Sequence, residues 1–189
     1  MNEIDIKKYF LRSLVAALAV SALIGIFIFL MGDFGETEVR LLLTTLTIGG
    51  FSLTGLCCAT IHHRIPLKSF SIIGMIISAI GFFLSIGVIW EWIEIDNIWK
   101  LWIIFLILSI AIAHSSLLLQ IIPSTDTIKY SLIATLFFIA FVALMLIKST
   151  LSEFDESEFF FRLLGVFTIL DAFGTTATPI LNKIAQKKA

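Results

Sequence analysis

Asp171 is the residue whose type and position most clearly suggest chemistry, because it is an acid inside a long apolar segment. It follows Arg162 by nine residues, which at the rise of an α-helix is roughly 13 Å and places it near the middle of a bilayer. An ionisable side chain at that depth usually faces a bundle interior or a water-filled cavity. The sequence therefore makes Asp171 a candidate proton carrier or cation partner, with a neutral, hydrogen-bonded structural acid as the alternative.

His114 is the second candidate for a functional group inside the membrane. It follows Lys100 by fourteen residues, or roughly 21 Å, so straight helices would place it roughly 7–8 Å deeper than Asp171. A contact between the two then requires a water molecule or a neighbouring threonine as a bridge. A histidine satisfied by a serine or a backbone oxygen is the alternative. Further candidates for a polar path through the bundle are Thr54, Ser109, Ser115, Thr175 and Thr176.

Signatures of catalysis or cofactor binding do not occur in the sequence. No second carboxylate accompanies Asp171 in the membrane, which excludes a glycosidase-like or protease-like acid pair, and no serine stands with a base on a defined turn. Walker, dinucleotide, haem and zinc motifs do not occur either. Adjacent His62 and His63 do not share a helix face, and adjacent Cys57 and Cys58 are typical of packing residues. We expect no cofactor and no metal, and an intramembrane enzyme is the weakest interpretation.

The elements that must position these residues are membrane-spanning helices. The chain has 189 residues, is 59% hydrophobic and 14% charged, and has a mean hydropathy of +1.05. This is more apolar surface than one soluble core of that size can bury. Spans need roughly 20 apolar residues, and backbone groups in lipid must be satisfied within the segment, so we expect helices. Six are expected, near 9–31, 39–61, 66–90, 99–122, 128–149 and 159–182.

Charged residues sort to alternate ends of the six expected spans. The basic ends carry Lys7, Lys8, Arg12, Arg64, Lys68, Lys129, Lys183, Lys187 and Lys188, and the acidic ends carry Asp33, Glu36, Glu38, Glu91, Glu94, Asp96, Glu153, Asp155, Glu156 and Glu158. By the positive-inside rule both termini lie in the cytoplasm and the outer face is acidic. The four tryptophans fall at the outer ends of the third and fourth spans, where an indole N–H can stay hydrated. We expect a multi-pass protein of the cell (inner) membrane.

A unit of roughly 60 residues recurs three times along the chain. The copies are helical hairpins at about 7–62, 66–123 and 127–183, and each contains an acid four residues before a base at the outer start of its second span. These pairs are Glu36 with Arg40, Asp96 with Lys100, and Glu158 with Arg162. Acid before base at this spacing is the favourable order on a helix. The prediction is an all-α membrane protein of three tandem parallel hairpins with pseudo-threefold symmetry about the membrane normal.

The repeat also aligns the interior residues. Nine residues after each base come Gly49, Ser109 and Asp171, and fourteen after come Thr54, His114 and Thr176. The second spans of the hairpins are therefore expected to form an inner ring. The first spans carry stripes of small residues that suit close helix packing, namely Ser13, Ala17, Ser21 and Gly25, and Gly74, Ser78, Gly81 and Ser85.

Two functions fit these features. The first is a transporter or channel for a small solute or ion that uses the midplane acid. The second is a non-catalytic membrane subunit or scaffold whose small-residue stripes bind helices of a partner or of another copy. The net charge of −1 gives no reason to expect a nucleic-acid partner. Apart from the bilayer, the expected partners are thus a second copy or a membrane complex.

Overall fold

The structure is a computed structural model that describes residues 9, 12, 15, 16, 19, 20, 22–27, 35–93 and 95–188. Residues 187 and 188 are described by their backbone only. It is 84% helix, and its described residues contain no strand. The described part of the chain therefore confirms the all-α prediction. Eleven residues of the expected first span, 9–31, lie outside the described residues, among them Ser13, Ala17 and Ser21 of its predicted stripe, and so do Lys7, Lys8, Asp33 and Glu94.

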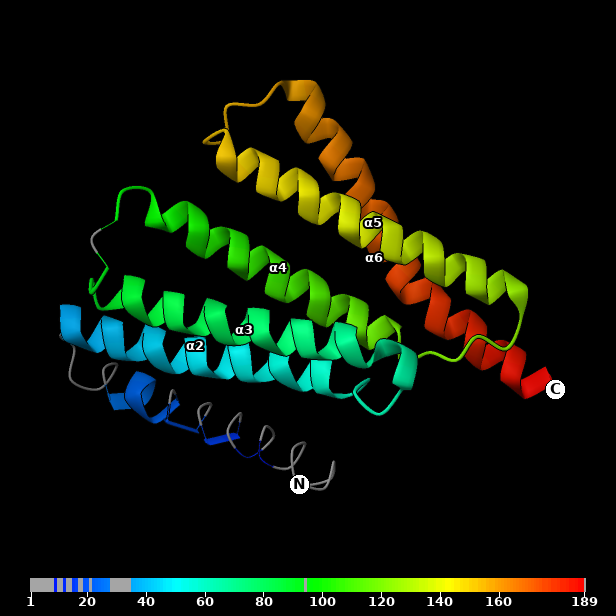
Figure 1. The fold of residues 1–189 in the computed structure, drawn as a ribbon, viewed down its shortest axis with the longest axis horizontal. Coiled ribbons are helices and arrows are strands. Elements are labelled where there is room, and N and C mark those ends of the chain that lie inside the picture. The colour runs from blue at the N-terminus through cyan, green and yellow to red at the C-terminus, as the bar shows by residue number, and fades with distance from the viewer. Residues whose placement is uncertain are drawn as a thin grey trace. The chain divides into compact units, whose positions relative to one another are not determined.

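Five long helices lie in the described ranges 35–93 and 95–188 (Figure 1). They are α2 (Glu36–Ala59), α3 (Lys68–Ile89), α4 (Ile98–Leu118), α5 (Asp126–Leu151) and α6 (Glu158–Lys188), with a short 3₁₀ turn, η1 (Ile65–Leu67), before α3. All five are long and apolar enough to cross a membrane. They coincide with five expected spans to within a few residues, except that α6 runs six residues further than predicted. By length and composition these helices indicate a multi-pass membrane protein; the predicted count of six spans and the threefold arrangement are not confirmed.

Pro179 lies inside α6 and does not end the helix. Proline removes one backbone donor, which in a membrane helix is tolerated where neighbouring groups compensate. The helix continues through this position to Lys188.

The chain forms two compact units, Met1–Ser109 and Ile110–Ala189, which divide within α4. In the first unit α2 and α3 are antiparallel neighbours and pack closely. The stripe predicted on the third span is buried in full, since Gly74, Ser78, Gly81 and Ser85 are all buried. At Gly81 an added Cβ would lie 2.7 Å from the ring of Phe51, so the small residue is what admits the aromatic ring.

Two of the four tryptophans tie helices of the first unit together. The indole N–H of Trp90 donates to Thr44 Oγ1 of α2 at 3.1 Å, and that of Trp102 donates to Ser85 Oγ of α3 at 2.8 Å. Trp92 is 72% exposed and Trp99 36% exposed. The expectation of hydrated indole N–H groups is therefore wrong for Trp90 and Trp102, because neighbouring hydroxyls accept their hydrogen bonds.

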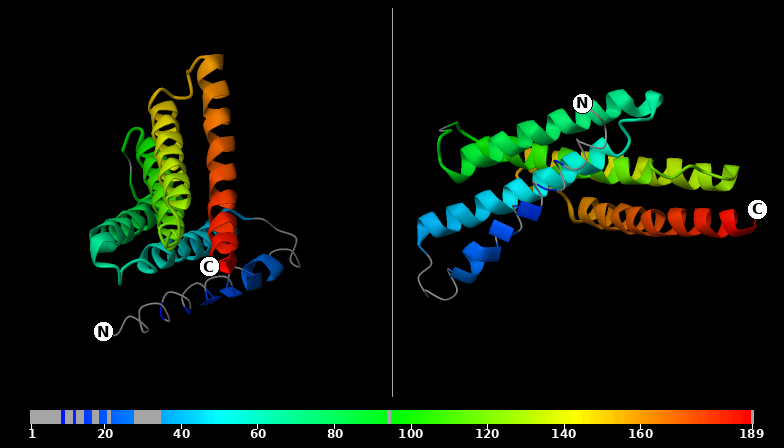
Figure 2. Two further views of the ribbon diagram at one scale, coloured as in Figure 1. Left: turned by 90° about the vertical axis from the view of Figure 1, so that its right-hand side faces the viewer. Right: turned by 90° about the horizontal axis from the view of Figure 1, so that it is seen from below.

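In the second unit α5 and α6 form an antiparallel hairpin, which Figures 1 and 2 show side by side. Hydroxyl groups line the interface between the two helices. Ser131 Oγ and Thr178 Oγ1 lie 2.8 Å apart, and the side chain of Thr135 occupies the position that a Cβ at Gly174 would take. A small apolar cluster of Leu118, Leu132 and Ile139 packs the end of α4 onto α5. In lipid, where apolar contacts give no hydrophobic gain, such hydrogen bonds and close approaches hold helices together.

The helices α3 and α5 end in the same way. Two residues after each helix comes a residue in the left-handed region, Glu91 (φ 53°) after α3 and Glu153 (φ 56°) after α5. The hydrogen bonds that close the two ends run from Trp92 N to Gly87 O at 3.0 Å and from Phe154 N to Ser149 O at 2.8 Å. This is the Schellman motif, here with glutamate where glycine is usual. Both glutamates stand nine residues before a predicted outer base, Lys100 or Arg162.

Candidate functional site

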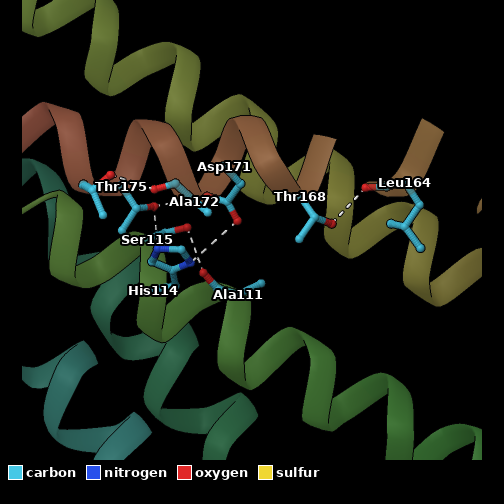
Figure 3. A network of polar contacts seen from close by, with 9 residues as sticks. Ala111, His114, Ser115, Leu164, Thr168, Asp171, Ala172 and Thr175 are labelled. Atoms are coloured by element: carbon cyan, nitrogen blue, oxygen red, sulfur yellow. Dashed lines mark hydrogen bonds and ion pairs between the residues drawn. The ribbon is translucent and has the colours of Figure 1, made fainter. Parts of the chain in front are cut away.

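Three polar side chains from two helices meet in the second unit (Figure 3). His114 comes from α4, and Asp171 and Thr175 come from α6. His114 Nε2 lies 2.9 Å from Thr175 Oγ1, and the Thr175 hydroxyl donates to Asp171 Oδ1 at 3.2 Å. His114 Nδ1 lies 4.0 Å from Asp171 Oδ2, the distance of an ion pair when the imidazole is protonated. These three side chains are called the α4–α6 cluster below.

The spacing of Asp171 and Thr175 explains half of this geometry. Four residues is slightly more than one helical turn, so both side chains lie on one face of α6 and the hydroxyl reaches the carboxylate without a change of backbone. Asp171 stands thirteen residues after Glu158 and seventeen before Lys188, near the middle of the helix. The acid is therefore roughly 20 Å from the N-terminal start of α6.

Both titratable groups of the cluster are partly buried. The side chain of Asp171 is 15% exposed and that of His114 is 30% exposed. Because the Thr175 hydroxyl has one proton and donates it to Asp171, it receives a hydrogen from Nε2 of the imidazole in this arrangement. In this arrangement Asp171 Oδ1 is an acceptor and His114 carries a proton on Nε2.

The structure brings Asp171 and His114 closer than the depth estimate from the sequence allowed. That estimate, a difference of roughly 7–8 Å, assumed straight helices running parallel to one another. The two side chains meet with Thr175 between them, which is the threonine bridge that the sequence left open as one way to connect them.

Pro179 adds a backbone feature to the cluster. Its nitrogen has no hydrogen, so the carbonyl of Thr175, four residues earlier, lacks the donor that a regular helix would supply. One turn of α6 thus presents a carboxylate, a hydroxyl and a carbonyl without its helical partner. Oxygen groups of these kinds solvate cations and water well.

The other predicted path residues of the second unit do not join the cluster. Thr176 is exposed, and its hydroxyl donates back to the carbonyls of Ala172 and Phe173. Ser115 donates to Ala111 O at 2.8 Å, next to His114 but without contact to Asp171 in the described hydrogen bonds. Both hydroxyls are therefore satisfied within their own helices.

Thr54 and Ser109 belong to the first unit, where their surroundings are local. Thr54 Oγ1 donates to Phe51 O at 3.0 Å, within its own helix. Ser109 is fully buried, 3.4 Å from the Cβ position at Gly81, and its hydroxyl has no hydrogen-bond partner among the described residues. Both thus occupy packed positions in that unit.

The acid–base pairs predicted at Arg40 and Arg162 are present as ion pairs. Arg40 contacts Glu36 at 2.5 Å and also Glu91 at 2.8 Å, while Arg162 contacts Glu158 at 2.6 Å. The third base, Lys100, has its ammonium group 5.6 Å from the centroid of the Trp99 ring, and Asp96 stands four residues before it. Exposed pairs of this kind contribute only a few tenths of a kcal/mol each.

Thr178 and Asn182 are polar residues of α6 that the sequence interpretation missed. Together with Asp171 and Thr175 they have spacings of four, three and four residues, which defines one stripe of the helix. Thr178 pairs with Ser131 of α5, and the amide oxygen of Asn182 accepts from Ser124 N at 3.3 Å. Counting along the helix from Asp171 was the signal that would have found them.

Metal binding has no support in the part of the chain that is described, since no three His, Cys, Asp or Glu side chains gather there. Comparison with protein-family models, curated proteins and solved structures finds no match for the chain. The fold and the site define the class: a multi-pass helical membrane protein with a histidine and an aspartate hydrogen-bonded through a threonine.

Proposed function

We propose that this chain is a transporter or channel for a small solute or ion, with Asp171 as the group that binds or couples it. The observation that carries the proposal is the α4–α6 cluster, in which two titratable side chains share one hydroxyl near the middle of α6. Ionisable groups at this depth are costly and are retained mainly where they act on an ion, a proton or a polar solute.

The polar stripe of α6 supports a route from this acid towards one membrane surface. Thr178 and Asn182 continue the face of Asp171 and Thr175 as far as the helix end that carries Lys183. The hydrogen bonds of Thr178 and Asn182 to Ser131 and Ser124 are also what helix packing alone requires. The cluster differs from them because two of its members can change charge.

The proposed pathway belongs to a protein with six spans, both termini in the cytoplasm and three parallel hairpins in the cell (inner) membrane. Support comes from the acids at the starts of α2 and α6 and from Lys68, Lys129 and Lys183 at the opposite ends. The matching ends of α3 and α5, each nine residues before a base, support the repeat in its second and third copies.

Ion flux into proteoliposomes tests the function. Liposomes containing the purified chain receive imposed gradients of H⁺, Na⁺, K⁺ or Cl⁻ in turn, and the flux of each ion is measured in the wild type and in Asp171→Asn. We expect flux of at least one of these ions, and a loss of about tenfold or more in the variant, because a neutral amide can neither pair with a cation nor carry a proton.

Asp155→Asn is the matched control, since it makes the same chemical change at an exposed loop position and should leave the flux unchanged. A wild-type chain that carries none of the four ions contradicts an ion pathway. Equal flux from wild type and Asp171→Asn removes the proposed role of the acid.

The second candidate function is a membrane subunit whose α6 binds a helix of another copy. Its support is a face of small residues, Gly165, Ala172 and Thr176, that is exposed along α6. A Cβ at Gly165 would meet nothing within 4 Å, so a partner backbone has room to approach. Only 6% of the most apolar window of α6 is buried.

Co-purification of two differently tagged copies in mild detergent tests this candidate. The wild type should co-purify, Gly165→Leu should not, and Val166→Leu at the neighbouring exposed position should behave like the wild type. A wild-type chain that runs only as a monomer, or a Gly165→Leu variant that still associates, argues against it.

A further inference from the structure

Among the described residues, the Thr175 hydroxyl alone contacts both titratable members of the α4–α6 cluster by hydrogen bonds. It lies 2.9 Å from His114 Nε2 and 3.2 Å from Asp171 Oδ1. A hydroxyl donates one hydrogen bond and accepts others, and it reverses direction by rotating about its C–O bond. The 2.9 Å separation lies within the reach of proton transfer along a hydrogen bond, and the 3.2 Å separation lies at its upper limit.

We propose that Thr175 relays a proton between Asp171 and His114, so that the ion moved through the cluster is the proton. This inference rests on the proposed function and specifies its substrate. The carrying observation is the unbroken chain of two hydrogen bonds from a carboxylate oxygen to an imidazole nitrogen (Figure 3).

The transfer balances without any further reactant. At the start Asp171 is neutral and donates its Oδ1 proton to Thr175 Oγ1, while the hydroxyl donates to the unprotonated Nε2 of His114. The Oδ1–H bond breaks as that proton bonds to Oγ1, and the original hydroxyl proton bonds to Nε2. The products are a carboxylate, an intact hydroxyl and an imidazolium, the hydrogen-bond directions being those of the structure described above.

The geometry also stabilises the charge-separated products. After transfer, Nδ1–H of the imidazolium lies 4.0 Å from the second carboxylate oxygen, Oδ2, so opposite charges face one another at the distance of an ion pair. Among the described residues, no other charged side chain has a hydrogen bond or ion pair with the cluster. The hydrogen bonds that α5 and the loop before it make to the polar stripe of α6 come from the uncharged residues Ser131 and Ser124.

If Thr175 only linked α4 to α6 structurally, the distances would be the same but the effect of substitutions at position 175 would differ. A link tolerates any side chain that preserves packing, whereas a relay requires a hydroxyl at position 175. Thr175→Val keeps the shape and removes the hydroxyl, and Thr175→Ser keeps the hydroxyl and removes a methyl group. The pair of variants therefore separates chemistry from packing.

The experiment measures proton uptake into proteoliposomes that contain a trapped pH-sensitive dye, driven by a potassium diffusion potential set with valinomycin. We expect Thr175→Val to lower the initial rate about tenfold or more and Thr175→Ser to retain most of it. Thr168→Val is the matched control, because its hydroxyl donates only to Leu164 O of its own helix, at 2.8 Å. It should leave the rate unchanged.

The outcomes separate the relay from the function beneath it. If Thr175→Val takes up protons at the wild-type rate while Asp171→Asn does not, the relay is wrong and the pathway stands. If both variants match the wild type, both proposals are wrong. If Thr175→Val does not give a monodisperse protein, Thr175→Ala and His114→Gln replace it, and wild-type uptake by either variant overturns the relay.

Discussion

A methyl group added at Gly174 should separate α5 from α6. The new Cβ would overlap the hydroxyl of Thr135 and would lie 3.0 Å from its Cγ2 and 3.1 Å from its Cβ. Thr135 is fully buried, and its hydroxyl donates to Ser131 O at 2.9 Å, so the side chain must leave that hydrogen bond or push the helix away. Overpacking of this kind costs about 1–3 kcal/mol, of which the lost hydrogen bond accounts for about 1 kcal/mol.

The measurement is the melting temperature of Gly174→Ala in detergent, followed by the loss of the monodisperse peak on size-exclusion chromatography. A loss of about 1–3 kcal/mol lowers the melting temperature by about 2–12 °C in a chain of this length. Gly50→Ala is the control, because nothing lies within 4 Å of its added Cβ and it should melt like the wild type or above it.

The double variant Gly174→Ala with Thr135→Ala decides the cause. Removing Oγ1 and Cγ2 of Thr135 removes the two nearest atoms, so the added methyl group should cost less in this background than in the wild type. A Gly174→Ala variant as stable as the wild type, or a cost that is the same in both backgrounds, refutes the reasoning from close packing.

Three further predictions use the same melting assay. Trp102→Phe loses the bond to Ser85 and should cost about 0.5–1.5 kcal/mol, whereas the exposed Trp92→Phe should cost nothing; equal shifts would contradict the bond. Asn97 has φ 63°, so Asn97→Ala should cost about 1 kcal/mol and Asn97→Gly should not, and an Ala variant that melts with the wild type would argue against that strain. Pro179→Ala restores a backbone donor within α6 and should stabilise the protein by about 1 kcal/mol; a lower melting temperature would show that the proline is needed.

The helices were predictable because the bilayer leaves the backbone few choices. Once a segment such as 128–149 is apolar over its length, its amides must bond within the segment, and the structure has α5 at Asp126–Leu151. The buried stripe of α3 was predictable for a similar reason, since serines and glycines spaced by three and four residues allow a close neighbour. Spacing along one helix was thus sufficient for both features.

The candidate site was predictable only within a single helix. Asp171 and Thr175 share a face of α6 by their spacing, and the sequence contains that information directly. The approach of His114 depends on the course of two helices that are sixty residues apart in the chain, and counting residues from a surface charge assumes that both run straight. The roles of Trp90 and Trp102 were missed for the same reason, because Thr44 and Ser85 belong to other helices.

The polar groups of the second unit show why depth and charge, rather than polarity alone, identify a site in lipid. Hydroxyls of Ser131, Thr135 and Thr178 are fully accounted for by helix packing, since each has a hydrogen-bond partner on its own or the neighbouring helix. A carboxyl group is a poor substitute for them, because packing could be satisfied by a serine at far lower cost in lipid. The pairing of Asp171 with a histidine through a hydroxyl adds a second group that can gain or lose a proton, which packing does not require. The two halves of the polar stripe of α6 therefore differ in what they can do. Thr178 and Asn182 make hydrogen bonds that hold the second unit together, whereas Asp171, linked through Thr175 to His114, can also gain or lose a proton.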